Sequence, residues 1–497
     1  MEPTTDAQGL RAGTARVDIT GGSTDQIDAP LYAAIDADKG ADSLYVRALV
    51  LREGATTVVL VTVDAVAIAN IGSIRNDFLD NVRARVAQDP GIEAGHVIIN
   101  ASHCHGVVCA DVETRTVLAV REAAQNLTPV TVGVGRGHED RIMENRRMRL
   151  RSGREADVRR AYCLPSDEEV VSVGPVDPEI GILRLDRIQG GTLALVYNFA
   201  CHPIQGVPAG GNTADLSGFA SQVIEHGFGD GAIAFFLQGC AADINPVRYR
   251  DVDNPPDAEP LGQRLGLSTL RTAREIRCTE TNPLKVIRDF IALPKANLLP
   301  TIESLEAEQS RLLQALQPTS LNLKSFIPLL IKHRLSPEFP SYDAHTYLSE
   351  RRMGREDLQH LDQNNRRLLD QYTDNIHIME ELTRISVNLG LLRMHQARNA
   401  APPGTTVEAE VTGLRIGPFA LVTFGGELPV EMGLQLKRKS PHEATFVAGV
   451  TNGYLYYTST ADQLLNRGGA QEDSDCFVAS EWQQVFEDKA LDILKRL

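Results

Sequence analysis

The chain has 497 residues, of which 42% are hydrophobic and 23% charged, the balance of a water-soluble globular protein. Its formal net charge of −15 would repel the phosphate backbone of nucleic acid and an anionic membrane leaflet, so we expect no nucleic-acid partner. No apolar run approaches the roughly 20 residues that cross a bilayer, so we expect no transmembrane segment.

The N-terminus and the cysteines bear on the compartment. Residues Met1–Gly13 contain no basic stretch followed by an apolar one, so they do not resemble a secretory signal. The seven cysteines are odd in number and form no C-x-x-C pair, which favours reduced thiols over a disulfide framework. The sequence therefore predicts a cytoplasmic protein.

From Ala12 to about Phe290, short apolar runs alternate with helical stretches, which predicts an α/β fold. Two of the expected strands run directly into polar clusters, and strand ends are where open α/β sheets usually place their chemistry. The expected strands are Ala48–Leu51, Val58–Val63, His96–Asn100, Thr192–Phe199 and Ala232–Leu237, with a helix over Ile71–Val86 between the second and the third.

Residues 298–400 change character to long, charged, Leu-rich stretches, such as Ile302–Leu316 and Asp357–Gln396, whose apolar spacing is helical. They predict a helical insertion with a solvated polar face; a lid and an oligomer contact are the alternatives. Pro402 and Pro403 break the last helix. Two strands and a closing helix follow, over Thr406–Arg415, Ala420–Phe424 and Ser480–Leu497.

The first chemical cluster, Asn100–Gly106, contains His103 and His105 directly after an expected strand. In an extended chain, residues two apart point to the same side, so both imidazoles can face one site. This arrangement suits a metal ion. A structural or general-base role is the alternative reading of the same residues.

Two further clusters follow later strands. His202 precedes a proline, which disfavours the helical conformation, so we expect it extended at a strand end, where it is a plausible further ligand. A histidine that only caps the strand is the alternative. Asp243 and Asn245 follow small residues that permit close backbone approach to a ligand, although a tight turn would use the same residues.

The fourth and fifth clusters lie beyond the helical insertion. Glu427 follows two glycines after a strand, and Thr451–Tyr457 contains three tyrosines. Zinc accepts carboxylate oxygen alongside imidazole nitrogen, and a catalytic zinc keeps an open position for water. Two histidines, Glu427 and a tyrosine would fit such a site, whereas aromatic core packing is the alternative for each tyrosine.

These five clusters, in this order and with this central insertion, resemble the neutral, non-lysosomal ceramidase family. The resemblance runs from Ala12–Thr20, similar to the opening strand of that family, to the closing helix. It implies mixed β-sheets flanked by helices, with residues 1–497 forming a single catalytic domain that contains the 298–400 insertion. Because the chain stops at Leu497, we expect no accessory immunoglobulin-like C-terminal domain.

The resemblance also implies roles for individual residues. It makes a Zn²⁺ ion the expected cofactor. His105 would line the active site, Arg146 would face the substrate, and Tyr457 would take the second aromatic position of the tyrosine segment. The implied zinc ligands are His103, His202, Glu427 and Tyr454.

Two departures from that family bear on the substrate. Gly106–Cys109 replaces a Ser-Gly-Pro-Gly type stretch, so the loop beside the scissile bond should differ. Asn245 stands where true ceramidases have a serine implicated in catalysis. An amide side chain cannot act as an alkoxide nucleophile, so a mechanism that needs serine there is excluded.

The sequence therefore predicts a zinc-dependent hydrolase in which metal-activated water cleaves an N-acyl amide bond of a small-molecule or lipid-like substrate, not necessarily ceramide. His105 or Asp243 would transfer protons. Arg146 or Tyr457 would stabilise the oxyanion, and Asn245 could donate a hydrogen bond to it. The alternatives are a zinc esterase or lactonase, an amide-forming acyl-transfer enzyme and a non-catalytic ligand-binding protein. A second metal ion near Asp64 or Asp215 also stays open.

Overall fold

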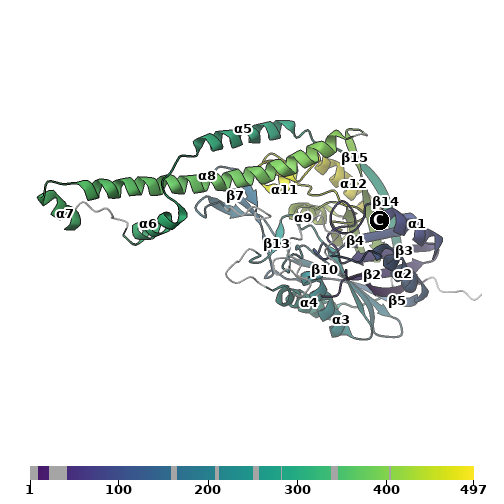
Figure 1. Ribbon diagram of the computed structural model, residues 1–497. Helices are drawn as coiled ribbons and strands as arrows, with labels where there is room; N and C mark the ends of the chain where they lie inside the picture. Colours follow the sequence, from purple (N-terminus) through teal and green to yellow (C-terminus); the bar gives the residue numbers. More distant parts are fainter. Residues whose placement is uncertain are drawn as a thin grey trace, which may run out of the picture.

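The computed structural model describes residues 9–21, 42–157, 165–206, 212–249, 257–280, 283–336, 345–401 and 404–497. Two β-sheets share one core, helices cover them, and a long helical arm projects from one side (Figure 1). The expected α/β fold of mixed sheets with a helical insertion is confirmed. The expected helix break at Pro402 and Pro403 lies outside the described residues.

The larger sheet has eight strands in the order β12-β11-β10-β5-β1-β2-β3-β4. The pairs β3–β4 and β11–β12 are parallel and the other pairs are antiparallel, so the sheet is mixed. In chain order the strands are β1 (Arg11–Asp18), β2 (Tyr45–Glu53), β3 (Thr56–Val63), β4 (Val97–Ala101), β5 (Thr128–His138), β10 (Glu179–Arg187), β11 (Thr192–Phe199) and β12 (Ile233–Gln238).

The smaller sheet packs against the larger one. Leu49 and Val196 of the larger sheet share a buried core with Leu421 and Phe446 of the smaller. A Cβ at Gly181 would lie 2.1 Å from the Phe446 ring, so only glycine permits this close approach. The smaller sheet consists, in spatial order, of β14 (Leu284–Pro294), β15 (Thr406–Ile416), β16 (Phe419–Phe424) and β17 (Ala444–Ala448), the last pair being parallel.

Helices cover the outer faces of both sheets, because their apolar sides complete the buried clusters there. On the larger sheet these are α1 (Phe78–Gln88), α2 (Val112–Gln125), α3 (Asp215–Phe228) and α4 (Ala258–Glu275). On the smaller sheet they are α9 (Val430–Lys439) and α12 (Trp482–Arg496). The short elements are η1 (Ala94–His96), β6 (Met143–Asn145), β7 (Arg147–Leu150), β8 (Glu155–Asp157), β9 (Val170–Val173), β13 (Ile244–Pro246), α10 (Ala461–Leu464) and α11 (Gln471–Ser474).

Between β14 and β15 the chain forms the arm, which consists of α5 (Leu299–Ala315), α6 (Leu323–Leu335), α7 (His345–Arg352) and α8 (Asp357–Ala400). Helix α5 packs on the second half of α8 through a small apolar core of its own. Helices α6 and α7 lie at the far end of α8 (Figure 1). Among the helices in the described ranges, none combines the length and the apolar character needed to cross a membrane.

The helix expected over Ile71–Val86 is shorter in the structure, because α1 begins at Phe78. Residues 71–77 form a loop that contacts other parts of the chain. Within residues 71–77, Ser73 Oγ accepts the Val108 N–H at 3.2 Å, Asn76 Oδ1 accepts the Asn70 N–H at 2.7 Å, and Ile74 is buried in the core. Local helical periodicity is therefore overridden by contacts to distant segments.

Candidate metal centre

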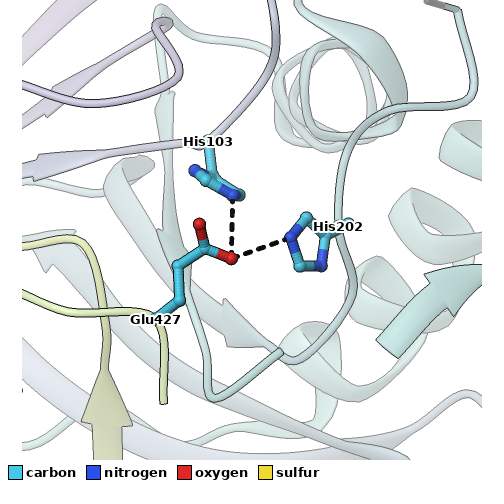
Figure 2. Close-up of side chains that lie close together, drawn as sticks. All are labelled: His103, His202 and Glu427. Atoms are coloured by element: carbon cyan, nitrogen blue, oxygen red, sulfur yellow. Dashed lines mark hydrogen bonds and ion pairs between the residues drawn. The ribbon is translucent and has the colours of Figure 1, made fainter. Parts of the chain in front are cut away.

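Three predicted ligands meet in the structure. His103 follows β4, His202 follows β11 and Glu427 follows β16, so both sheets contribute to one point (Figure 2). Their candidate ligand atoms all lie within 4.8 Å of one another, and all three residues are buried. Glu427 Oε2 lies 3.1 Å from His202 Nε2 and 3.4 Å from His103 Nε2. Among the described residues, this is the group of His, Cys, Asp and Glu side chains placed to hold a metal ion.

The other ring nitrogen of each histidine is held by the backbone. His103 Nδ1 lies 2.6 Å from the Val66 carbonyl oxygen, and His202 Nδ1 lies 3.0 Å from the Ile244 carbonyl oxygen. A carbonyl only accepts hydrogen bonds, so both Nδ1 atoms carry the proton. In the neutral rings, both Nε2 lone pairs therefore face the Glu427 carboxylate. A cation bound between them would turn this repulsion into attraction, and a metal-bound histidine usually donates its other ring N–H to a carbonyl or carboxylate in this way.

The electrostatics of the pocket agree with this arrangement. Burial, with a further contribution from the Arg146 charge, lowers the pKa of His202 to about 4, so its ring is neutral at pH 7. Burial would raise the pKa of Glu427, but the carboxylate attracts and hydrogen-bonds a proton on the Nε2 atom of His103 or His202, and this interaction holds its pKa well below the ordinary value. Neutral imidazole and ionised carboxylate are the forms that bind metal ions.

Tyr454 reaches the same centre from the segment after β17. Its hydroxyl donates to Glu427 Oε1 at 2.5 Å. The backbone is fixed nearby, because Glu427 N donates to the Tyr456 carbonyl and Leu455 N donates to the Gly425 carbonyl. Burial and the Glu427 charge raise the pKa of Tyr454 well above its ordinary value. The fourth predicted ligand thus contacts Glu427 directly.

His103 and His105 are close, but not through an extended backbone. His103 has φ of +68°, in the left-handed region, so the expected extended conformation is wrong at this residue. The ring centroids of His103 and His105 are nonetheless 5.7 Å apart. His105 is half-buried and lies beside the metal-ligand group without belonging to it.

Arg146 organises the polar side of the site. Its guanidinium donates to the Tyr457 hydroxyl oxygen at 3.0 Å and to Asn245 Oδ1 at 2.9 Å. A third bond, at 2.6 Å, joins its Nε to Glu472. All four side chains are buried, so Arg146 fixes Tyr457 and Asn245 relative to each other.

No model of a known protein family matches the sequence, and no curated protein is similar to it in sequence. Solved structures are similar in three dimensions. A crystal structure of neutral ceramidase from Pseudomonas aeruginosa matches with a TM-score of 0.61 and 17% identity over 99% of this chain and 75% of that chain. The chain has a neutral ceramidase-like fold. A structure of a ceramidase complexed with C2 matches equally well, over 99% of this chain and 76% of that one.

Within this ceramidase-like fold, Asp243 has a structural position. Its Oδ1 accepts the Val430 N–H at the start of α9 at 2.9 Å, and its Oδ2 accepts a hydrogen bond from Asn145 at 3.0 Å. Burial raises the pKa of Asp243. Both carboxylate oxygens are therefore engaged in holding α9 and β6, although Asp243 lies next to the Arg146 cluster.

Sequence reasoning missed Glu472, which lies in the short helix α11. Its carboxylate binds Arg146 and approaches Arg147 at 3.5 Å, while Arg147 pairs with Asp473 at 2.7 Å. Burial raises the pKa of Glu472 to about 8. In the sequence, Glu472, Asp473 and Asp475 resemble an acidic, solvated loop, so only the three-dimensional contact with Arg146 reveals the position of Glu472 in the site.

Sequence reasoning also missed the contact between the arm and the site. His395 of α8 is fully buried and bonds Asp475 at 2.6 Å. Its ring packs edge-on against Tyr456, with centroids 4.8 Å apart, and Tyr456 in turn packs against Tyr454 at 5.2 Å. The C-terminal part of α8 is therefore the packing support of the tyrosine segment.

The remaining candidates lie in structural positions. Asp64 forms a buried ion pair with Arg47 at 2.8 Å. Asp215 accepts backbone N–H groups of Gly206 and Leu216. Cys104, the neighbour of His103 in the sequence, is also buried; burial raises the pKa of its thiol to about 12, so the thiol is protonated near pH 7 and is a poor metal ligand in that form.

Proposed function

We propose that the chain is a zinc-dependent hydrolase that cleaves an N-acyl amide bond. The observation that carries the proposal is the pair of histidine Nε2 lone pairs facing the Glu427 carboxylate, because each Nδ1 proton is already donated to a backbone carbonyl. This donor set fits a borderline cation that accepts nitrogen and oxygen ligands. His103, His202, Glu427 and Tyr454 would hold the ion.

Zinc, when bound, would polarise the scissile carbonyl and lower the pKa of a water molecule to about 7. The protein would supply the other steps. Arg146 donates to the Tyr457 hydroxyl oxygen and so fixes the position of that hydroxyl, which would stabilise the oxyanion. His105, beside His103, would transfer the proton to the leaving amine, since both oxygens of Asp243 are engaged elsewhere.

The amide class is supported by the solved neighbours, which are ceramidases. Asn245 accepts a hydrogen bond from Arg146, so it is a second polar group held beside the site, without the nucleophilic chemistry of a serine. The substrate would be a small-molecule or lipid-like amide and need not be ceramide, because the Gly106–Cys109 loop differs from that of true ceramidases. A cytoplasmic location and an oligomer through the arm stay predictions.

The test is metal analysis of the purified protein together with product analysis. About one zinc per chain, lost in His103→Ala and His202→Ala, and release of fatty acid from N-acyl amides would support the proposal. Faster turnover of matched esters or lactones, or net amide formation, would replace the amide hydrolase by those alternatives. A protein that neither contains nor takes up zinc would refute the mechanism and favour a binding protein.

A further inference from the structure

The far end of the arm carries an unusual concentration of exposed apolar side chains. Of the nineteen large hydrophobic side chains that are exposed in the described residues, eight lie between Leu323 and Leu361. Four of them form a row on α6 at intervals of four residues, which places them along one side of the helix. They are Leu323, Ile327, Ile331 and Leu335, with exposed fractions of 62%, 43%, 52% and 80%.

A different face of α6 packs against α8. Phe326 is buried and stacks on Tyr372 of α8, with ring centroids 4.4 Å apart. Asn322 caps the helix by accepting the N–H groups of Lys324 and Ser325. The helix is therefore anchored to the arm through one face, and the apolar row is presented outward by a fixed element.

The charges on α6 have one sign. The helix contains Lys324, Lys332 and Arg334, all exposed, and no acidic residue. Lys332 also lies 3.8 Å from Asp362 of α8. The acids near the tip, which include Glu350, belong to α7 and the start of α8, and the Glu350 carboxylate is turned inward to accept the Leu358 N–H. An apolar row flanked by basic residues is the pattern of a helix that lies in a membrane interface.

The length of the arm separates α6 from the negative charge of the body. The chain as a whole carries −15, which on its own predicts repulsion from an anionic leaflet. From Tyr372, which stacks on Phe326 of α6, to Asn388, which accepts a hydrogen bond from Ser474 of the body, α8 rises by 16 residues, or roughly 24 Å at about 1.5 Å per residue. That exceeds the Debye length of about 8 Å severalfold, so the acidic body does not oppose contact at the tip.

We propose that the tip of the arm docks on a membrane surface containing anionic phospholipid. The row on α6 would enter the interface between headgroups and acyl chains, and the three basic residues would contact headgroup phosphates. A projecting tip suits a flat lipid surface, and the basic flank matches the charge of anionic headgroups. This inference concerns where the protein acts and does not depend on the chemistry of the metal centre.

The test is sedimentation of the full-length protein with phospholipid vesicles. Vesicles of phosphatidylcholine and phosphatidylserine in equal parts should bind at least about tenfold more protein than phosphatidylcholine alone, since each basic residue near the surface contributes roughly fivefold and α6 carries three of them. High salt should reduce the difference. Ile327→Glu/Ile331→Glu should abolish binding, whereas Leu118→Glu/Leu267→Glu, at exposed apolar positions on α2 and α4, should leave it unchanged.

Other outcomes overturn the proposal. Wild-type protein that sediments with neither vesicle refutes it, and equal binding by the two double variants refutes the role of α6. If light scattering shows a dimer that Ile327→Glu/Ile331→Glu converts to a monomer, and no vesicle binding is seen, a second copy of the chain covers the row instead. Zinc content and hydrolysis are separate measurements, so the failure of this proposal and the failure of the proposed function are distinguishable.

Discussion

Replacement of Glu427 by glutamine should have opposite effects on the metal-free and the zinc-loaded protein. In the metal-free protein at pH 8, the carboxylate opposes two imidazole lone pairs at 3.1 and 3.4 Å. The amide of glutamine has nearly the same shape, and its NH₂ group can donate to Nε2. Relief of such an unsatisfied buried contact is worth about 1–3 kcal/mol. The metal-free variant should therefore be more stable than the metal-free wild type.

The magnitude can be converted to a melting temperature. For 497 residues, an unfolding entropy of about 2.1 cal/mol/K per residue gives about 1 kcal/mol per degree. Glu427→Gln should then raise the Tm of the metal-free protein by about 1–3 °C. Zinc at a thousandfold excess over its Kd stabilises the wild type by about 4 kcal/mol, or about 4 °C, and this shift should be largely absent in the variant.

The assay is calorimetric or fluorimetric melting at pH 8 with chelator and with zinc. The same measurement on Glu431→Gln, an exposed acid on α9, controls for the loss of one negative charge. A metal-free Glu427→Gln protein that melts below the wild type while keeping the full zinc shift would show that Glu427 is a structural partner of the histidines. In that case the argument from opposed lone pairs fails.

Three other predictions concern single side chains. Tyr457→Phe should lower kcat about 10- to 1,000-fold with little change in KM, because the lost hydroxyl donor faces charge that develops in the transition state. Steady-state kinetics measures both constants. A change in KM alone would contradict the oxyanion role of Tyr457. Burial raises the pKa of Asp215 to about 6 against an ordinary 3.8, so the wild type should lose about 3 kcal/mol of stability as pH rises from 4 through 6. Denaturant unfolding of Asp215→Asn should lack this loss, and parallel pH profiles would contradict the assignment. His395→Ala should weaken zinc binding about 10- to 100-fold in calorimetric titration, because it supports the tyrosine segment, whereas the exposed neighbour Met394→Ala should not.

The site could be predicted from the sequence to the extent that local patterns carry chemistry. His103, His202 and Glu427 each follow a strand, and the structure brings them together within 4.8 Å. Polar residues that directly follow a strand lie at the end of that strand. The strands themselves can be recognised from the pattern of neighbouring residues in the sequence. The helical insertion was likewise predictable, since a run of Leu-rich helical spacing depends only on the near sequence.

Contacts between distant segments were not predictable in this way. The helix expected from Ile71 begins at Phe78, because residues 71–77 form a loop in which Ser73 accepts the Val108 N–H. His103 takes a left-handed backbone that its neighbours in sequence do not require. Glu472 lies 326 residues along the chain from Arg146, to which it binds. His395 lies about 61 residues from Tyr456, against which it packs.

The total charge of the chain follows from the sequence, whereas the distribution of that charge over the surface follows from the tertiary structure. The sequence by itself determines that the chain is acidic, with a net charge of −15, and that its helices and strands alternate as in an α/β fold. Only the tertiary structure decides where the charges and apolar side chains lie, because α8 carries the acid-free helix α6 far from the body. Composition sums over the whole chain, whereas binding depends on what is gathered within a Debye length of one surface.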